Sequence, residues 1–230
     1  MSPPAQRHAL ITGTSSGIGL AVARRLIDAG WSVAGLDRAA PAFAAANFSP
    51  HRLDLADAAA IDRHLAHVSR PVDAIIHAAG FMRTGALGQL RAQDGEAMWR
   101  VHVLAATLIV NGLAARLPHA ARIVLIGSRT ASGAAARSQY AAAKAALIGL
   151  ARSFALELAP RAITVNVISP GATQTPMLTD PARNGVAPRL PPMGRFVTPD
   201  EIAGVAAFLL SDAAASITGQ NIVVCGGASL

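Results

Sequence analysis

Short apolar runs alternate along this chain with longer stretches in which apolar residues recur at helical spacing. Runs of this kind, bounded by glycine, proline or polar residues, are typical of buried strands. We predict seven strands, at residues 8–12, 31–37, 51–55, 72–77, 122–128, 162–168 and 220–225. We predict the principal helices at residues 20–29, 56–68, 96–117, 138–159 and 199–210, the last with Thr198 as its N-cap.

Strands that alternate with helices favour one parallel sheet covered on both faces. The predicted fold class is therefore α/β, a Rossmann-like, doubly wound, seven-stranded parallel sheet in a three-layer αβα arrangement, with ligands outside the carboxyl ends of the strands. The 230 residues show no repeat and no interdomain linker, so we expect a single domain over residues 1–230. Residues 175–197 lack periodicity and carry several prolines, which favours a substrate lid.

Composition and charge exclude several other classes of function. The net charge is +7, but the arginines are scattered, no basic run reaches five residues and no aromatic residues interleave with them, so no nucleic-acid partner is expected. Cys225 is the only cysteine, which excludes an intrachain disulfide, and the seven histidines form no metal-ligand pattern. No secretory signal is present and residues 101–115 are too short to span a bilayer, so we expect a cytoplasmic protein without membrane contact.

The stretch Gly13-Thr-Ser-Ser-Gly17-Ile-Gly19 follows a predicted strand and opens a predicted helix. In that context Gly13 makes a tight turn, Gly17 allows the backbone to approach a pyrophosphate, and Gly19 allows close helix–strand packing. An ordinary glycine turn is the alternative. Asp37 lies 20 residues beyond Gly17 and ends the second strand, where a carboxylate binds an adenosine ribose and repels a 2′-phosphate.

These residues favour NAD over NADP as cofactor, because Ser16 offers no positive charge to a 2′-phosphate. Arg38 keeps NADP open, because a guanidinium there could pair with such a phosphate.

Tyr140 is the only tyrosine in the chain, and Lys144 is the only lysine beside 19 arginines. Four residues apart on one helix, they share a face, and an ammonium beside a phenol favours the phenolate. A tyrosine tuned in this way can transfer protons near neutral pH. The alternative is coincidence, because an Arg- and Ala-rich composition leaves both residue types rare.

Taken together, the chain resembles the short-chain dehydrogenase/reductase family, in its compact single-domain branch, over nearly its full length. The matching motifs are Thr12-Gly-Thr-Ser-Ser-Gly-Ile-Gly19, Asp54-Leu55, Ala79-Gly80, Ser128 with Tyr140-Ala-Ala-Ala-Lys144, Asn166-Val-Ile-Ser-Pro-Gly171, Thr175, Gly194-Arg-Phe, Thr218-Gly-Gln and Gly226-Gly. The resemblance implies that Ser128 binds the substrate oxygen, Tyr140 transfers the proton, and Lys144 binds the nicotinamide ribose. It further implies cofactor contacts at Gly13, Ser15, Ser16, Gly17, Ile18, Gly19, Asp37, Arg38, Asp54, Leu55, Ala79, Gly80, Tyr140, Lys144, Pro170, Gly171, Thr173 and Thr175. Ser132 and Ser138 offer alternative hydroxyls for the role of Ser128 in binding the substrate oxygen.

The chain departs from the family pattern at four positions. His77 stands where the family more often has an asparagine, and His102 replaces the asparagine that often completes the catalytic set. His102 either holds a water of the proton relay or is a packed helix residue. Cys225 replaces the usual aspartate and is interpreted as an apolar strand residue, and Gly127 precedes Ser128 where a second serine is common.

The expected function is an NAD(P)-dependent alcohol dehydrogenase or carbonyl reductase (EC 1.1.1.-) that interconverts a secondary alcohol and a ketone on a small molecule. The alternative is a dinucleotide-sensing or scaffold protein without turnover. Arginines near the site allow an anionic substrate, although a solvated surface explains them equally well. Candidate pocket residues are Phe81, Met82, Arg83, Arg129, Arg137, Met177, Leu178, Arg183 and Arg189. The resemblance also implies a homotetramer or homodimer.

Overall fold

The computed structural model describes residues 6–181 and 187–230 of the chain. It contains a seven-stranded sheet in the order β3-β2-β1-β4-β5-β6-β7, with all neighbouring strands parallel, as predicted. The strands are β1 (His8–Thr12), β2 (Ser32–Asp37), β3 (Phe48–Arg52), β4 (Ala74–His77), β5 (Arg122–Ile126), β6 (Thr164–Pro170) and β7 (Asn221–Val224). The order reverses between β1 and β4, the switch point at which doubly wound sheets bind ligands.

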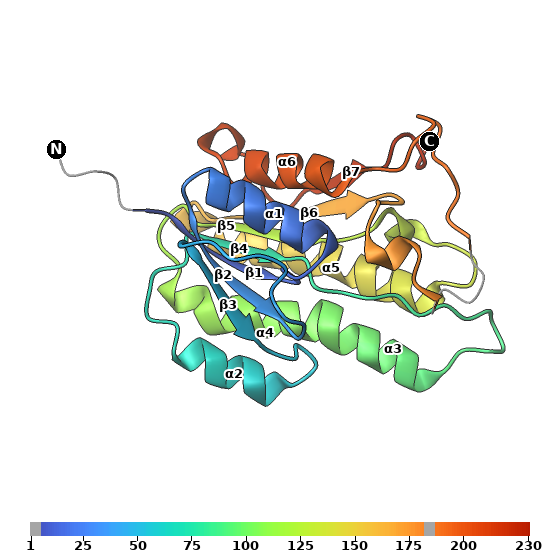
Figure 1. Cartoon of the computed structure of the whole chain (residues 1–230), viewed down its shortest axis with the longest axis horizontal. Helices are drawn as coiled ribbons and strands as arrows, with labels where there is room; N and C mark the ends of the chain where they lie inside the picture. The colour runs from blue at the N-terminus through green and yellow to red at the C-terminus, as the bar shows by residue number, and fades with distance from the viewer. Residues whose placement is uncertain (1–5, 182–186) are drawn as a thin grey trace.

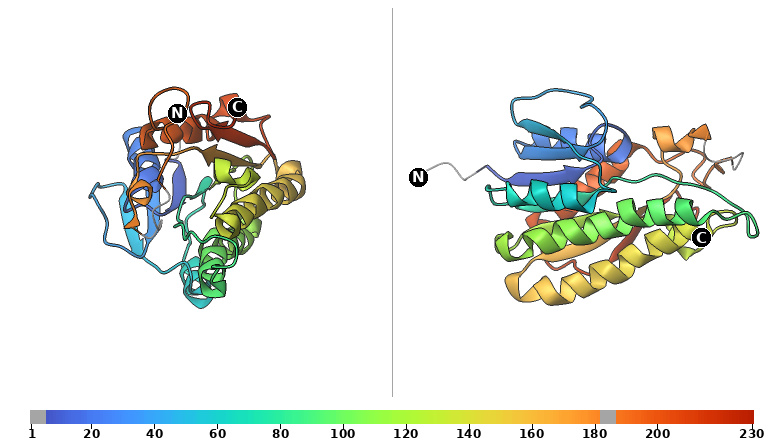
Figure 2. Two further views of the ribbon diagram at one scale, coloured as in Figure 1. Left: turned by 90° about the vertical axis from the view of Figure 1, so that its right-hand side faces the viewer. Right: turned by 90° about the horizontal axis from the view of Figure 1, so that it is seen from below.

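Helices cover both faces of the sheet, which gives the predicted three layers (Figure 1). On one face lie α1 (Gly17–Asp28) and α6 (Pro199–Leu209), and their apolar residues form one core with the sheet. On the other face lie α2 (Ala58–Ala66), α4 (Ala105–Leu113) and α5 (Ser138–Leu158), which complete a second core. Helix α3 (Ala92–Trp99) also lies on this face, and its buried Met98 packs with Met82 and Tyr140. Helices α3 and α5 lie side by side, as both views in Figure 2 show.

Five 3-10 turns and one π-helical turn complete the described secondary structure outside residues 182–186. They are η1 (Arg100–Leu104, π-helical), η2 (Ala114–Arg116), η3 (Arg129–Ser132), η4 (Ala159–Arg161), η5 (Pro176–Leu178) and η7 (Asp212–Ala214).

Most predicted boundaries shift by one to three residues, and two predicted elements differ more from the structure. The third strand is residues 48–52 and not 51–55, so Asp54 and Leu55 follow it. This edge strand has only Phe48 buried and contains Pro50, so it carries no apolar run to mark its position. The helix predicted at 96–117 begins at Ala92, and the π-helical turn η1 interrupts it before α4. Apolar periodicity does not detect such an interruption, because the residues of a π-turn are as apolar as those of the helix around it.

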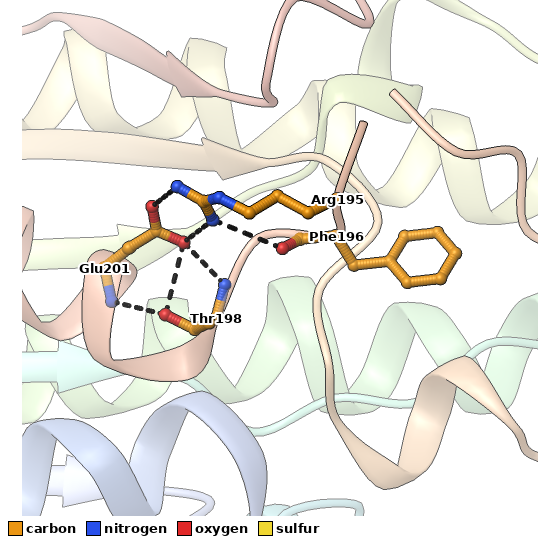
Figure 3. Close-up of polar contacts among 4 residues, drawn as sticks. All are labelled: Arg195, Phe196, Thr198 and Glu201. Carbon is orange, nitrogen blue, oxygen red and sulfur yellow. Dashed lines mark hydrogen bonds and ion pairs between the residues drawn. The ribbon is translucent and has the colours of Figure 1, made fainter. Parts of the chain in front are cut away.

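The start of α6 agrees with the prediction from Thr198 (Figure 3). The Thr198 hydroxyl accepts a hydrogen bond from the Glu201 amide, and the Glu201 carboxylate accepts one from the Thr198 amide at 2.8 Å. Arg195 donates to both oxygens of the same carboxylate, at 2.7 and 2.8 Å. A capping box of this kind satisfies donors that the first turn of a helix leaves unpaired.

The helical segment Ala92–Arg116 has 25 residues and is long and apolar enough to cross a membrane by length and composition alone. The apolar run predicted from the sequence, residues 101–115, is shorter. Within the segment, Met98, Ile109 and Leu113 are buried, the latter two in the core beneath the sheet. The core helix of a globular domain has this same character.

Candidate active site

A cavity of about 1380 Å³ opens at the carboxyl ends of the strands. Its walls come from the loops after β1, β2, β4 and β5, from the end of β6, and from residues 175–181 and 187–192. Of the cofactor residues predicted from sequence, all but Gly19 line it. The topology therefore brings together segments that lie far apart in the chain.

The glycine loop forms one wall of the cavity. Gly13 has a φ of +77°, and a Cβ there would come within 2.8 Å of the Ala79 backbone. Gly17 has a φ of +54° and begins α1, whose N-cap Ser16 makes no capping hydrogen bond through its side chain. The amides of this helix start therefore remain available to an anion in the cavity. Gly19 does not line the cavity and packs against the Gly13 carbonyl, which agrees with its predicted role in close packing at the start of the helix.

Asp37 lies at the end of β2 beside Arg38, and both line the cavity. Its carboxylate accepts hydrogen bonds from the amides of Ser15 and Ala39, each at 2.9 Å. These bonds hold the carboxylate at the mouth of the glycine loop and leave further lone pairs for a ligand hydroxyl. A smaller cavity of about 320 Å³ adjoins this corner and is lined by Asp37, Arg38, His51 and Arg52, among others.

Tyr140 and Lys144 lie together on α5, both buried and both facing the cavity. The Lys144 Nζ atom lies 5.8 Å from the centre of the Tyr140 ring and donates a hydrogen bond to the Ile126 carbonyl at 2.7 Å. Burial lowers the pKa of Lys144 from 10.5 to about 7. The predicted Tyr140–Lys144 pair is therefore present, and the Lys144 ammonium loses its proton near neutral pH.

Ser128 follows β5 and lines the same cavity, whereas the competing Ser132 and Ser138 are exposed and do not. The Ser128 hydroxyl accepts a hydrogen bond from the Thr130 amide at 3.1 Å. Its own hydrogen is therefore available to an oxygen atom in the cavity.

A further wall of the cavity is the turn after β6. Pro170, Gly171, Thr173 and Thr175 line the cavity, and the Thr173 hydroxyl donates to the Gly171 carbonyl at 3.1 Å. A Cβ on Gly171 would come within 2.8 Å of the Cys225 backbone, so only glycine fits this close approach. Cys225 is buried directly after β7, with its Sγ atom 3.2 Å from the Ser229 hydroxyl.

His102 lies behind the cavity wall and does not line it. Its Nε2 atom is 2.8 Å from the Phe81 carbonyl, and its ring meets the Tyr140 ring edge-on at 5.6 Å. Burial first, and then the Lys144 charge, hold the pKa of His102 well below its usual range. The same two causes lower the pKa of His77, at the end of β4, to about 3.

The predicted substrate residues fall into different surroundings. Arg129 and Met177 line the cavity, as do Arg137 and Arg189. Arg83 does not line it: its guanidinium lies 5.0 Å from the centre of the Phe81 ring and 4.0 Å from the Asp180 carboxylate. Arg183 lies outside the described residues.

Sequence reasoning missed three contributions to the site. The Ile126 carbonyl binds Lys144, Val101 of the π-turn reaches the cavity, and Leu230 at the end of the chain lines it too. The first two carry no residue-type signal, since one is a backbone atom and the other an ordinary apolar side chain. Within residues 6–181 and 187–230, no group of three or more His, Cys, Asp or Glu side chains is placed to hold a metal ion.

Comparisons with known proteins agree with this geometry. The family profile described as Enoyl-(Acyl carrier protein) reductase matches residues 13–229. The chain is 36% identical to the 2,3-dihydro-2,3-dihydroxybenzoate dehydrogenase of Escherichia coli strain K12, over 97% of each chain. It is 34% identical to the 3-oxoacyl-(acyl-carrier-protein) reductase FabG of Salmonella typhimurium strain LT2, over 95% of this chain and 96% of that one.

Solved structures are similar over the same extent. A short-chain dehydrogenase from Burkholderia cenocepacia in complex with NADP has a TM-score of 0.89 and 32% identity, covering 99% of this chain and all of the other. A 3-ketoacyl-(acyl-carrier-protein) reductase from Brucella melitensis with NADH has a TM-score of 0.86 and 28% identity, covering 97% and 98%.

The parallel sheet, the glycine loop at its switch point and the buried Tyr–Lys pair define an oxidoreductase with a Rossmann-like fold. With the profile match and the relatives above, the chain belongs to the short-chain dehydrogenase/reductase family.

Proposed function

We propose that this chain is an NAD(P)-dependent dehydrogenase that interconverts a secondary alcohol and a ketone on a small molecule. The observation that carries this proposal is the position of Ser128, Tyr140 and Lys144, which line the same cavity as the glycine loop. A pair at helical spacing could arise by chance, but chance does not explain a third polar group, the Ser128 hydroxyl after β5, in the same cavity. The named relatives include both dehydrogenases and reductases, which leaves the direction open.

The cavity fits a dinucleotide cofactor. A Cβ at Gly13 would overlap the Ala79 backbone, so the chain is adapted to bring these two segments together around a narrow anion-binding turn. Asp37 at the end of β2 and Asp54 shortly after β3 line the cavity. Thr175 lies against Gly17 of the glycine loop, and Tyr140 and Lys144 of α5 line the same cavity. Asp37 would bind the adenosine ribose, the start of α1 the pyrophosphate, and Lys144 the second ribose.

The protein residues would then handle the proton and the substrate oxygen. When bound, the nicotinamide ring supplies or accepts the hydride at its C4 atom. Ser128 donates its free hydrogen to the substrate oxygen and orients it toward Tyr140. Tyr140 exchanges the proton with that oxygen, and the charged form of Lys144 stabilises the phenolate that remains.

Replacing Tyr140 by phenylalanine removes only the phenolic oxygen and tests this assignment. Purified wild-type protein, given NAD or NADP and a panel of secondary alcohols, is expected to produce the absorbance of the reduced cofactor. Tyr140→Phe is expected to lose roughly a hundredfold to ten-thousandfold in kcat while it retains cofactor binding, because general acid–base catalysis contributes about that much. A Tyr140→Phe variant with wild-type turnover would contradict the assignment.

A dinucleotide sensor or scaffold without turnover is the alternative function. The retained Tyr140 and Lys144 argue against it, since a sensor has no use for a buried ammonium whose pKa is lowered to about 7. Tight binding of NADH together with no turnover of any member of a broad panel would favour the sensor.

We also propose residues 175–197 as a substrate lid, because Met177 to Pro181 and residues 187–192 line the cavity. Residues 182–186 of this segment lie outside the described part of the chain.

We further propose an anionic substrate, because Arg129, Arg137 and Arg189 line the cavity. Arg129→Gln should raise KM for hydroxy acids but not for neutral alcohols of similar size. Equal rates for the two substrate types in the wild-type protein would rule the idea out.

We also propose a cytoplasmic homotetramer or homodimer. Trp99, Leu104 and Leu156 are large apolar side chains exposed on the α3–α4 segment and on α5, with Leu156 80% exposed. Light scattering coupled to size-exclusion chromatography would show a monomer at micromolar concentration if this proposal is wrong.

A further inference from the structure

Two buried histidines connect the end of β4 to the π-turn η1 in a reciprocal way. His77, the last residue of β4, places its Nε2 atom 3.0 Å from the carbonyl of Val101 in the π-turn. His102, in the π-turn, places its Nε2 atom 2.8 Å from the carbonyl of Phe81, which follows β4. Each segment therefore binds the backbone of the other through an imidazole ring.

The partners of these rings determine their tautomers. A carbonyl oxygen can only accept a hydrogen bond, so the Nε2 atom of each ring must carry a hydrogen. The Nδ1 atom of a neutral His77 is then an acceptor, 3.1 Å from the Thr12 hydroxyl. That hydroxyl already accepts from the amides of Ala78 and Ala79, at 3.1 and 3.0 Å, so its single hydrogen points to His77. Every hydrogen-bonding position of the Thr12 hydroxyl is thus used.

Both rings are held in the neutral state by their surroundings. Burial, and then the charge of Lys144, lower the pKa of both rings. The backbone hydrogen bonds of His77 and His102 raise these pKa values, but by less than burial and Lys144 lower them. No carboxylate of the described residues contributes to the pKa of either ring, so no anion offsets the cost of a buried imidazolium.

A proton relay through the His102 ring would have no exit. A proton that arrived at Nδ1 would have to leave from Nε2, and Nε2 faces the Phe81 carbonyl, which cannot carry a proton onward. Nδ1 itself is buried and has no hydrogen-bond partner. A Cβ on Gly80 would come within 2.7 Å of this atom, so the ring lies directly against the backbone of the cavity wall.

We propose that His77 and His102 are positioning residues that act as one reciprocal brace, in which two neutral Nε2–H imidazoles fix the Gly80–Phe81 wall and the π-turn behind Tyr140. The brace lies between two parts of the site. Gly80 and Phe81 line the cavity on one side of His102, and the ring of Tyr140 meets it edge-on at 5.6 Å on the other. His102 is not a proton carrier in this arrangement. The catalytic consequence rests on the proposed function, whereas the tautomers do not.

Nuclear magnetic resonance of the protein labelled with ¹⁵N-histidine tests the brace without any substrate. Among the seven histidines, two are expected to stay neutral and Nε2-protonated between about pH 5.5 and 9, a range in which an ordinary histidine titrates. His77→Asn and His102→Asn assign the two signals. An Nδ1-protonated ring, or titration of the His102 signal in that range, would overturn the proposal whether or not the enzyme assay works.

Kinetics of matched variants then test what the brace positions. His102→Phe keeps a ring but loses the donor, whereas His102→Asn keeps a donor. With an active substrate, His102→Phe should lose roughly tenfold to a hundredfold in kcat, with little change in cofactor KM, because small displacements at a reacting centre cost about that much. His102→Asn should restore most of the loss, and added imidazole should restore none. His8→Phe, at a buried histidine on the other end of the sheet, controls for lost stability.

The two halves of the brace should also be coupled. Once one half is removed, removal of the second has little further effect on the same interface, so His77→Phe combined with His102→Phe should cost little more in kcat than the more severe single variant. Full additivity of the two losses, wild-type kcat in His102→Phe, or rescue by imidazole would each contradict the brace. Melting curves recorded by circular dichroism identify a variant that has merely unfolded.

Discussion

Lys144 is buried at a position where a charge is costly. Its hydrogen bond to the Ile126 carbonyl replaces only one of the three that an ammonium can donate, and burial lowers its pKa to about 7. A residue this poorly solvated contributes little to the fold. Its retention in a chain with 19 arginines and no other lysine therefore points to chemistry beside Tyr140.

Replacing Lys144 by methionine should stabilise the protein and abolish turnover. The pKa is 10.5 in the unfolded chain and about 7 in the folded one, so between these values the unfolded state binds more protons. Wild-type stability therefore rises with pH across this window. The difference between 10.5 and about 7 corresponds to roughly 5 kcal/mol, of which the lost hydrogen bond to the Ile126 carbonyl offsets about 2 kcal/mol. The gain from Lys144→Met should therefore be on the order of 3 kcal/mol at or below pH 7, and should shrink as the pH approaches 10.5. Urea unfolding at several pH values measures it. A loss of stability, or a gain independent of pH, would contradict the buried-ammonium account.

Asp37 is the residue on which cofactor choice should depend. Its carboxylate would repel a 2′-phosphate, while Arg38 on the same wall would attract one. Asp37→Asn keeps an acceptor for the ribose but loses the charge, so the ratio of kcat/KM for NADP to that for NAD should rise by roughly tenfold or more. Arg38→Gln should move the ratio the other way. An unchanged ratio in Asp37→Asn, or a wild-type preference for NADP, would refute the assignment to NAD.

At the scale of elements, apolar periodicity in the sequence predicted strands and helices with a clear buried run or face. It did not predict features that depend on hydrogen bonds to backbone groups. Strand β1 and helices α5 and α6 lie where the pattern indicates, because each buries a clear run or face. The edge strand β3 has one buried residue and no such run. The π-turn η1 is hydrogen-bonded to the end of β4 and to the loop after it, and the tautomers of His77 and His102 depend on carbonyl groups that no residue type specifies.

The capping box at the start of α6 gives a prediction for a single element. Thr198→Ala should destabilise the protein by about 1 kcal/mol, because it leaves the Glu201 amide without its acceptor. For a chain of 230 residues this lowers the melting temperature by about 2–4 °C. Ser153→Ala, at an exposed position inside α5, is the control and should cost nothing. Equal melting temperatures for Thr198→Ala and the wild type would show that the capping box contributes no measurable stability.

The same box should weaken in acid. Hydrogen bonds from Arg195 and from the Thr198 amide lower the pKa of Glu201 from 4.5 to about 2. Its contribution is therefore complete above the unfolded value of 4.5 and is lost as the pH falls toward 2.

At the scale of the whole molecule, the positive charge has a structural explanation. Several arginines donate hydrogen bonds to backbone carbonyls at or just after the C-terminal ends of helices, where many carbonyls lack a partner within the helix. Arg116 donates to Val68 and Leu65, Arg161 to Ala114 and Leu117, and Arg7 to Leu210. A net charge of +7 therefore needs no polyanionic partner.

The residue types of the candidate site could be predicted from the sequence, but the contacts among them could not. Glycines, Asp37, Ser128, Tyr140 and Lys144 are rare or distinctive residue types whose spacing follows the strands, so motif and topology together place them at one edge of the sheet. Arg83 lies off the cavity because it contacts Phe81 and Asp180, and no pattern in the chain reports such contacts.

We propose above all that a hydride is transferred in this cavity between a nicotinamide ring and a carbon atom of a small molecule, with Tyr140 transferring the proton. Incubation of the protein with NADH or NADPH carrying two deuterium atoms at C4, together with a panel of ketones, tests the transfer itself by mass spectrometry. We predict an alcohol that carries one deuterium on its carbinol carbon, formed by the wild type and not by Tyr140→Phe. Deuterium that stays on a tightly bound cofactor across a broad panel, or equal transfer by Tyr140→Phe, would contradict the account.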